Sequence, residues 1–247
     1  MNKLESIAEK AHAAFEARTQ VRDQALLQAR LLTRQSAYAI RAIHRDEEAA
    51  AAEHLTAAQK LLETIITNLS GFPDLYYAGY TQDAIKEYAE ARITCALIMN
   101  QPLPLPEDLG MEYPTYLNGL AEATGELRRR SLDLLRRGLA RDAERLLVSM
   151  DDIYSVLVTM DYPDAITNGL RRQTDLVRSI LERTRGDLTI SLREDELKQH
   201  IENLNRMLSR QSTDGVQPEQ DGFSSAQGES ELSGGSMKIT HADDPGV

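Results

Sequence analysis

Apolar residues recur at helical spacing almost throughout the chain, and this regularity constrains the fold more than any other feature. Residues three and four apart share a helix face, so each such segment has an apolar side to bury. Runs of alternating β-branched residues flanked by hairpin turns, which are typical of strands, are absent. The pattern therefore predicts an all-α, single-domain bundle of about six or seven helices.

Proline and glycine residues divide the pattern into segments. We expect helices at 3–45, 47–69, a third that contains 82–100, and then 115–138, 141–160, 164–185 and 192–210. The first is unusually long and consists largely of good helix formers. The Ser70–Pro73 breaker, the proline-rich loop 100–114, Gly138 and Gly186 are expected to end helices. The predicted organisation is a helical domain at 1–190, an additional helix at 191–210 and an acidic tail at 211–247.

The formal net charge of −11 is unevenly distributed. Residues 211–247 hold −6 of it and residues 1–210 hold −5. The tail is rich in Ser, Gly, Gln and acids and has too few apolar groups to offset the entropy of ordering it, so we expect disorder. An interaction arm is the alternative. Within the body, arginines gather in local stripes, as a nucleic-acid binder needs.

Membrane and secretory classes do not fit the sequence. No stretch reaches the roughly 18 to 20 apolar residues of a membrane span, and the N-terminal residues lack the apolar segment of a signal peptide. We therefore expect a cytoplasmic protein without a membrane partner. The one cysteine, Cys95, lies on an apolar helix, which predicts a packing residue rather than a nucleophile.

The segment 82–100 carries two glutamates in the middle of a largely apolar helix. Asp83, Glu87, Glu90 and Thr94 are three or four residues apart and form one polar stripe. Carboxylates close together are costly to bury unless cations, hydrogen bonds or a metal offset their repulsion and desolvation. On spacing alone, a solvent-facing stripe is the other interpretation.

The next helix repeats this arrangement. Glu122 and Glu126 share one face, and Gly119 and Gly125 allow another helix to approach closely. Two helices can thus present four carboxylates to each other. Oxygen ligands at that density suit Mg²⁺ or Mn²⁺, which activate water and stabilise charge on a phosphodiester.

Four longer segments carry a family resemblance. They are KEYAEA in the third helix, YLNGLAEATGELRRRSLDLL in the fourth, RQSAYAIRAIHR in the first and RRQTDLVRSILERTRGDLT in the sixth. With the helical order, they resemble the translin family, and within it the translin-associated factor X branch, as in a prokaryote-type translin-like protein. The likeness covers about residues 24–188 and does not include the tail.

The resemblance implies a closed homo-oligomer, an octamer in this family, that encloses a cavity and binds single-stranded nucleic acid. For the factor X branch it further implies a Mg²⁺- or Mn²⁺-dependent endoribonuclease acting on single-stranded RNA. Translin itself is understood as a non-catalytic binder of single-stranded RNA or DNA, and such a binder is the alternative function.

The catalytic acids of the family occur in two motifs. Glu87 and Glu90 match a Glu-Tyr-x-Glu-Ala motif, and Glu122 and Glu126 match an Asp-x-x-Gly-Glu motif with Glu122 in place of the aspartate. The extra methylene moves that carboxylate by about one C–C bond length, and Mg²⁺ is demanding about geometry. The resemblance implies that all four acids are catalytic, bind the metal and face the interior of the oligomer.

Arginines are predicted to bind phosphates rather than to perform chemistry. The candidates are Arg30, Arg34, Arg41, Arg45, Arg129 and Arg130. The first four lie near one stripe of the long helix, where they track a phosphate backbone or form an ordinary solvated face. The last two follow the second acidic pair and are candidates for contact with the scissile phosphate.

Other metal classes and protein roles fit less well. A di-iron or di-manganese bundle needs two Glu-x-x-His motifs, and only Glu9 to His12 matches. Zinc needs clustered His or Cys, and we expect the five histidines to lie apart from the acidic pairs. A helical scaffold whose tail does the work would bind no nucleic acid even at low salt.

Aromatic platforms for stacking bases are scarce, because the chain has no Trp and three Phe. Tyr76, Tyr77, Tyr80 and Tyr88 cluster before and within the acidic helix. They stack bases or pack against neighbouring helices, and packing is the favoured interpretation.

Overall fold

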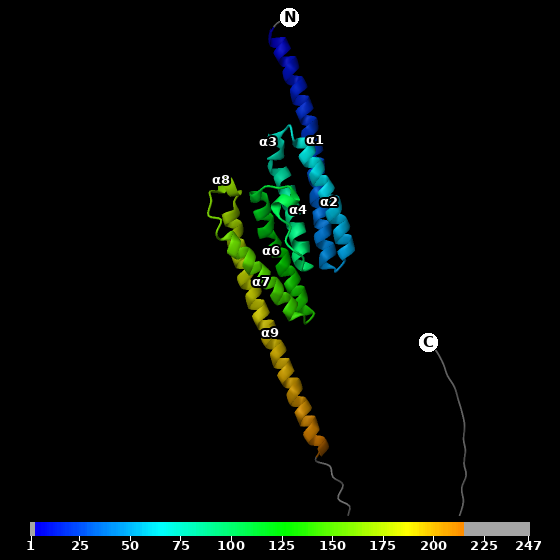
Figure 1. Ribbon diagram of the computed structural model, residues 1–247, viewed down its shortest axis with the longest axis vertical. Coiled ribbons are helices and arrows are strands. Elements are labelled where there is room, and N and C mark those ends of the chain that lie inside the picture. Colours follow the sequence, from blue (N-terminus) through cyan, green and yellow to red (C-terminus); the bar gives the residue numbers. More distant parts are fainter. Residues whose placement is uncertain (1–2, 215–247) are drawn as a thin grey trace, which may run out of the picture. The chain divides into compact units, whose positions relative to one another are not determined.

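The computed structural model describes the backbone of residues 3–214, which forms α-helices joined by short connections (Figure 1). No strand occurs in this range, which confirms the predicted all-α class. The six long helices are α1 (Lys3–His44), α2 (Glu48–Leu69), α4 (Gly79–Ile98), α6 (Tyr113–Arg136), α7 (Ala140–Leu157) and α9 (Leu170–Asp214). Three short ones are α3 (Pro73–Tyr76), α5 (Pro106–Leu109) and α8 (Asp164–Thr167). None of the described helices combines the length and apolar character needed to cross a membrane.

The chain divides into two units, residues 1–200 and 201–247. The first contains the helical bundle. The described part of the second, 201–214, is the end of α9, whose side chains are exposed as far as residue 209. Residues 211–214 of the predicted tail are therefore helical. The rest of that tail, 215–247, lies outside the described residues.

Two of the predicted helix boundaries near the C-terminus are wrong. Gly186 lies inside α9 rather than at a helix end, and a Cβ there would meet no atom within 4 Å. One glycine costs a helix only about 1 kcal/mol relative to alanine, which is too little to interrupt a long one. The actual break falls at Asn168 and Gly169, with φ of +53° and +80°. Asn and Gly adopt this left-handed conformation more readily than other residues, so they separate α8 from α9.

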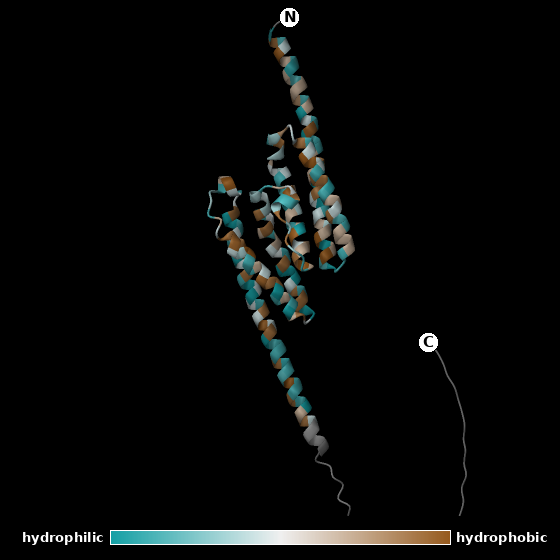
Figure 2. Cartoon of the chain, in the orientation of Figure 1, coloured by the Kyte–Doolittle hydropathy of each residue, from teal (hydrophilic) through white to brown (hydrophobic). Residues whose placement is uncertain are grey.

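Small side chains let α1 pack against α2 and α4. The buried positions of α1 recur every three or four residues and include Ala25, Ala29, Leu32, Ser36, Ala39 and Ile43. α4 in turn contacts α6, so it lies between α1 and α6 (Figure 1). Figure 2 shows apolar and polar residues mixed along each long helix, as expected for helices that bury one face.

The prediction that Tyr88 and Cys95 of α4 are packing residues is confirmed. Tyr88 and Cys95 are both fully buried. Burial raises the pKa of the Cys95 thiol to about 12, so the thiolate is not populated near neutral pH. Tyr77 differs from Tyr88, because it is exposed and its hydroxyl donates a hydrogen bond to Glu112 at 2.5 Å. Tyr76 and Tyr80 also pack against the core, so base stacking stays the alternative for the exposed Tyr77.

α4 and α6 approach each other closely at Gly119. A Cβ on Gly119 would lie 2.7 Å from the Cβ of Ala89 and 2.9 Å from the backbone oxygen of Lys86. Gly125, by contrast, has no atom within 4 Å of the place where its Cβ would stand. Of the two glycines expected to allow close approach, only Gly119 has that role in this chain.

The turn between α1 and α2 is attached to the end of α6 through Asp46. Its carboxylate accepts hydrogen bonds from Arg130 and, at 2.8 Å, from Nη1 of Arg137. Arg130 also donates to the backbone oxygen of His44 at 3.4 Å. These bonds, chiefly the one from Arg130, lower the pKa of Asp46. Asp46 itself has a φ of +62° and so ends α1.

We predict that Gly119→Ala lowers the free energy of unfolding by roughly 1 to 3 kcal/mol, because the added methyl group meets backbone atoms that must shift. Gly125→Ala is the matched control on the same helix, and it should be neutral or stabilise by about 0.5 to 1 kcal/mol. Urea unfolding monitored by circular dichroism measures both. Equal effects of the two substitutions would contradict the close crossing at Gly119.

We predict that Asp46→Asn lowers stability at pH 7 by about 1 kcal/mol or less, since Asp46 is half exposed and water screens its ion pairs. The lowered pKa means that the carboxylate stabilises the folded state above its ordinary pKa of 3.8. This contribution is lost as the pH falls below that value. The stability difference between the two proteins should therefore be constant from pH 6 to 8 and shrink below pH 4. A difference that persists in acid would show that the ion pairs contribute nothing.

Candidate metal centre

Three carboxylates from two helices converge where α4 crosses α6. Glu87 and Glu90 come from α4 and Glu122 comes from α6, and each offers one oxygen such that the three lie within 4.8 Å of one another. All three side chains are partly buried. Gly119 contacts Lys86, Ala89 and Glu90, so the three acids lie within about one helical turn of this crossing. The structure thus brings together three of the four acids that the sequence predicts.

Charge repulsion within the cluster is concentrated on α4. Burial first, and then the nearby carboxylates of Glu87, Glu122 and Glu126, together raise the pKa of Glu90 to about 8. Burial also raises the pKa of Glu87, although Lys86 opposes this. Neither carboxylate has a hydrogen-bond donor among the described side chains. Partly buried carboxylates without a donor favour a bound cation, which would replace the proton on Glu90.

Glu122 is held by two donors on its Oε1 atom. Nζ of Lys86 lies 2.7 Å away and Nε2 of Gln173 lies 3.2 Å away. Gln173 belongs to α9 and is separated from Glu122 by 51 residues, so no local spacing reveals this contact. The two donors fix the orientation of the carboxylate, and they leave Oε2 without either bond.

Glu126 lies beside the group of three and has partners of its own. Its Oε2 atom is 2.5 Å from Nε2 of His44 and 3.5 Å from Nη1 of Arg129. The hydrogen bond with His44 is the main reason that the pKa of Glu126 is lowered. The expectation that all histidines lie apart from the acidic pairs is wrong, because α1 ends beside α6 and places His44 on Glu126. A role for Glu126 as a fourth ligand stays a prediction.

His44 is nearly inaccessible to solvent. Its side chain is 3% exposed, and its Nδ1 atom has no hydrogen-bond partner in the described part of the chain. The sequence contained one signal for this residue, namely the His44-Arg45 pair at the end of a segment that resembles the family. The candidate metal ligands beside it are nevertheless carboxylate oxygens, which are able to hold a divalent cation.

The predicted phosphate-binding arginines fall into two groups. Arg30, Arg34 and Arg41 are exposed along α1, Arg45 is exposed in the turn directly after it, and Arg41 lies over the ring of Tyr38 at 4.9 Å. Arg129 is also exposed and lies one helical turn from Glu126. Arg130, by contrast, is buried and bonded to Asp46. Its guanidinium links α6 to the α1–α2 turn.

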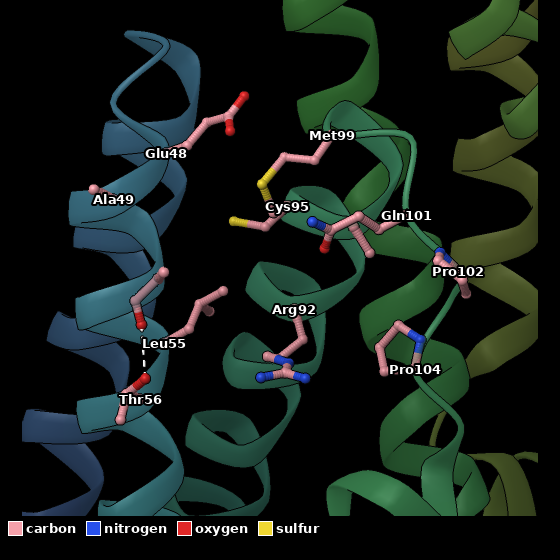
Figure 3. A pocket seen from close by; sticks show the side chains of 12 residues that line it. Glu48, Ala49, Leu55, Thr56, Arg92, Cys95, Met99, Gln101, Pro102 and Pro104 are labelled. Atoms are coloured by element: carbon pink, nitrogen blue, oxygen red, sulfur yellow. Dashed lines mark hydrogen bonds between the residues drawn. The ribbon is translucent and has the colours of Figure 1, made fainter.

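A pocket of about 500 Å³ lies between α2, the second half of α4 and the loop that follows it (Figure 3). Arg92, Cys95 and Met99 line it on the side of α4, and Pro102 and Pro104 line it on the side of the loop. None of the four candidate acids borders this pocket. The volume of a pocket therefore does not identify the candidate metal centre in this chain. The convergence of carboxylates identifies it.

The chain is similar to several known proteins, although no protein-family model matches it. A protein of Methanocaldococcus jannaschii described as uncharacterized protein MJ0175 is 30% identical over 194 residues, which cover 77% of this chain and 85% of that protein. The structure of AfC3PO in complex with duplex RNA has 31% identity and a TM-score of 0.70, and the match covers 74% of this chain and 95% of the other. A second AfC3PO structure matches equally well, with 30% identity and a TM-score of 0.70 over 74% of this chain and 96% of the other.

Apo-NeC3PO shares the fold, with a TM-score of 0.68 over 77% of this chain and 98% of the other. Its sequence identity of 20% supports the fold alone. All these structural matches cover nearly the whole of the other chain, so the helical arrangement is shared from end to end of those proteins.

We predict that the metal-free protein loses stability as the pH rises from about 4.5 to about 8, because the folded state holds a proton on Glu90 that the unfolded state releases. Glu90→Gln keeps the shape of the side chain without the charge. At pH 8 in EDTA it should be more stable than the wild type by roughly 2 kcal/mol or more. Thermal melts at pH 5 and pH 8 measure this, and an unchanged pH dependence in the variant would contradict it.

Proposed function

The chain belongs to the translin family, and on that premise we propose that it is a divalent-metal-dependent endoribonuclease that cleaves single-stranded RNA. The observation that carries the proposal is the convergence of Glu87, Glu90 and Glu122 from two helices to within 4.8 Å. The raised pKa of Glu90 adds to it, because the fold tolerates repulsion that a bound cation would relieve.

Glu87, Glu90 and Glu122 would hold Mg²⁺ or Mn²⁺, with Glu126 as a fourth ligand. When bound, such an ion supplies positive charge next to the phosphoryl oxygens and makes water a stronger nucleophile. Lys86 and Gln173 keep the carboxylate of Glu122 in one orientation. The imidazole of His44 and the carboxylate of Glu126 share a hydrogen across 2.5 Å, which fixes the position of Oε2 of Glu126.

RNA is the proposed ligand because AfC3PO, which is 31% identical to this chain over 95% of its own length, has been solved with duplex RNA. Arg30, Arg34, Arg41, Arg45 and Arg129 would bind the phosphate backbone, since all five are exposed. Arg130 reaches a phosphate only if it releases Asp46. Preference for a single strand, and binding of single-stranded DNA, belong to the proposal and rest on the family resemblance.

We propose that the chain forms a closed homo-oligomer, with eight subunits on the family pattern, and that the acids face the enclosed cavity. Exposed apolar side chains on α1 and α9 support the assembly. Leu4, Ile7 and Phe15 are each more than 60% exposed on α1, and Ile190 and Leu197 are each 61% exposed on α9. Apolar surface of this extent on a helix is typical of contacts with another chain.

A non-catalytic RNA binder is the second candidate, and one observation favours it. Lys86 lies 2.7 Å from Glu122 and is only 21% exposed, so the cluster already contains one cation. In that reading the carboxylates belong to a structural ion-pair network and no metal is needed.

We predict that the wild type cleaves labelled single-stranded RNA with Mg²⁺ or Mn²⁺ and not in EDTA. Glu87→Ala, Glu90→Ala, Glu122→Ala and Glu126→Ala should each lower the rate by roughly 100-fold, because each removes a carboxylate that would hold the ion. RNA affinity, measured by fluorescence anisotropy in EDTA, should be retained or increased in these variants since each loses a negative charge.

Asp152→Ala is the control for loss of an exposed acid outside the cluster. It should leave the cleavage rate unchanged. Binding of RNA by the wild type without any metal-dependent cleavage would establish the second candidate instead.

A further inference from the structure

A pocket of about 220 Å³ adjoins the carboxylate cluster, and every side chain that lines it is polar or charged. Lys86 and Gln173, the two donors to Glu122, form part of its wall. The pocket therefore lies beside the proposed metal centre, with Lys86 and Gln173 between them. It is smaller than the roughly 300 to 1,000 Å³ of typical small-molecule sites, so it has room for one compact group.

The inner wall of the pocket is held in place by hydrogen bonds. The hydroxyl of Thr115 donates to Oε1 of Gln82 at 2.6 Å, and Nε2 of Gln82 donates to the backbone oxygen of Tyr76 at 2.9 Å. Asn118 donates from Nδ2 to the backbone oxygens of Pro114 and Thr167 at 2.8 and 3.0 Å. Because Gln82, Thr115 and Asn118 already form hydrogen bonds within the protein, they shape the pocket. Other residues of the wall are available to bind a ligand.

Three groups at the pocket remain able to bind a ligand. The carboxylate of Asp83 is exposed and makes no hydrogen bond or salt bridge within the described residues. The side chain of Asn168, at the left-handed turn before α9, is likewise exposed and without a hydrogen bond. Lys86 has three N–H donors and uses one on Glu122. The pocket thus offers a charged acceptor together with donors.

We propose that this pocket holds one base of the bound RNA by its Watson–Crick edge, with Asp83 accepting a hydrogen bond from an exocyclic amino group. The inference rests on the proposed function only in taking RNA as the ligand. Adenine, cytosine and guanine carry such an amino group and uracil does not. Uracil carries a carbonyl oxygen in place of that amino group, and its one donor, N3–H, lies between two carbonyl oxygens that repel the carboxylate, so uracil is disfavoured.

A neutral base fits this pocket better than a phosphate group. Asp83 lines the pocket and lies close enough to Glu87 to raise its pKa, and Glu122 lies directly behind Lys86 and Gln173, so an anion in the pocket would be repelled by nearby carboxylates. The carboxylate of an Asp accepts the amino group of a base, and the amide of Asn168 and the ammonium of Lys86 donate to ring nitrogens or carbonyl oxygens of the same edge.

The test measures binding of the full chain in EDTA to fluorescein-labelled hexauridylate and to three versions in which one central uridine is replaced by adenosine, cytidine or guanosine. We expect the wild type to bind the substituted oligonucleotides about fivefold or more tightly than hexauridylate. Asp83→Ala should abolish this difference. Asp83→Asn, which keeps an acceptor oxygen, should retain part of it.

Asp175→Ala is the matched control, since Asp175 is an exposed acid on α9 that does not line the pocket. Removal of its charge should tighten binding of all four oligonucleotides equally and keep the preference. The proposal is overturned if the wild type binds all four alike, if it binds none, or if Asp83→Ala shifts all four by one factor as the control does. Because the assay needs no metal and no cleavage, its outcome is independent of whether the protein is an endoribonuclease.

Discussion

The site depends on the crossing of α4 and α6 at Gly119, where a side chain larger than hydrogen would meet backbone atoms. That crossing places Glu122 against Glu87 and Glu90, and the repulsion among these carboxylates opposes it. Apolar packing on both helices holds them together. Ile85, Tyr88, Ile93 and Leu127 are each 1% exposed or less, and each such buried side chain contributes roughly 1.5 to 3 kcal/mol. The core thus sustains a cluster that its own charges would separate.

Only two of the four candidate acids have hydrogen-bonding or ion-pair partners, and this difference favours a role in binding a cation. Glu122 has Lys86 and Gln173, and Glu126 has His44 and Arg129. Glu87 and Glu90, in the centre, have no donor among the described side chains. A purely structural network gains most from a partner on Glu90, whose pKa is raised chiefly by burial, yet here the partners bind Glu122 and Glu126. Glu87 and Glu90 are therefore the carboxylates that a bound cation would neutralise.

Periodicity and breakers predicted the long helices and the polar stripe on α4, because both depend on neighbours within a turn or two. The same reasoning failed at Gly186, where a local propensity of about 1 kcal/mol yielded to the packing of a long helix. It also missed the break at Asn168 and Gly169, although an Asn-Gly pair is itself a turn signal in the sequence. The contacts of His44 with Glu126 and of Gln173 with Glu122 span 82 and 51 residues. Such contacts follow from helix packing, which spacing within one helix does not encode.

The balance of local charge explains how an acidic chain can accept a polyanion. Exposed charges separated by more than about 10 Å are largely screened at 0.1 M salt, so the net charge of −11 matters less than the groups around the cluster. There, once a cation has displaced the proton that Glu90 holds near neutral pH, the four ionised candidate acids exceed Lys86 and Arg129 by two negative charges, which one divalent cation would cancel. A phosphate that approaches along Arg129 would then meet a neutral cluster instead of a repulsive one. Metal and RNA therefore favour each other's binding in the proposed mechanism, and by linkage each raises the affinity for the other by the same factor.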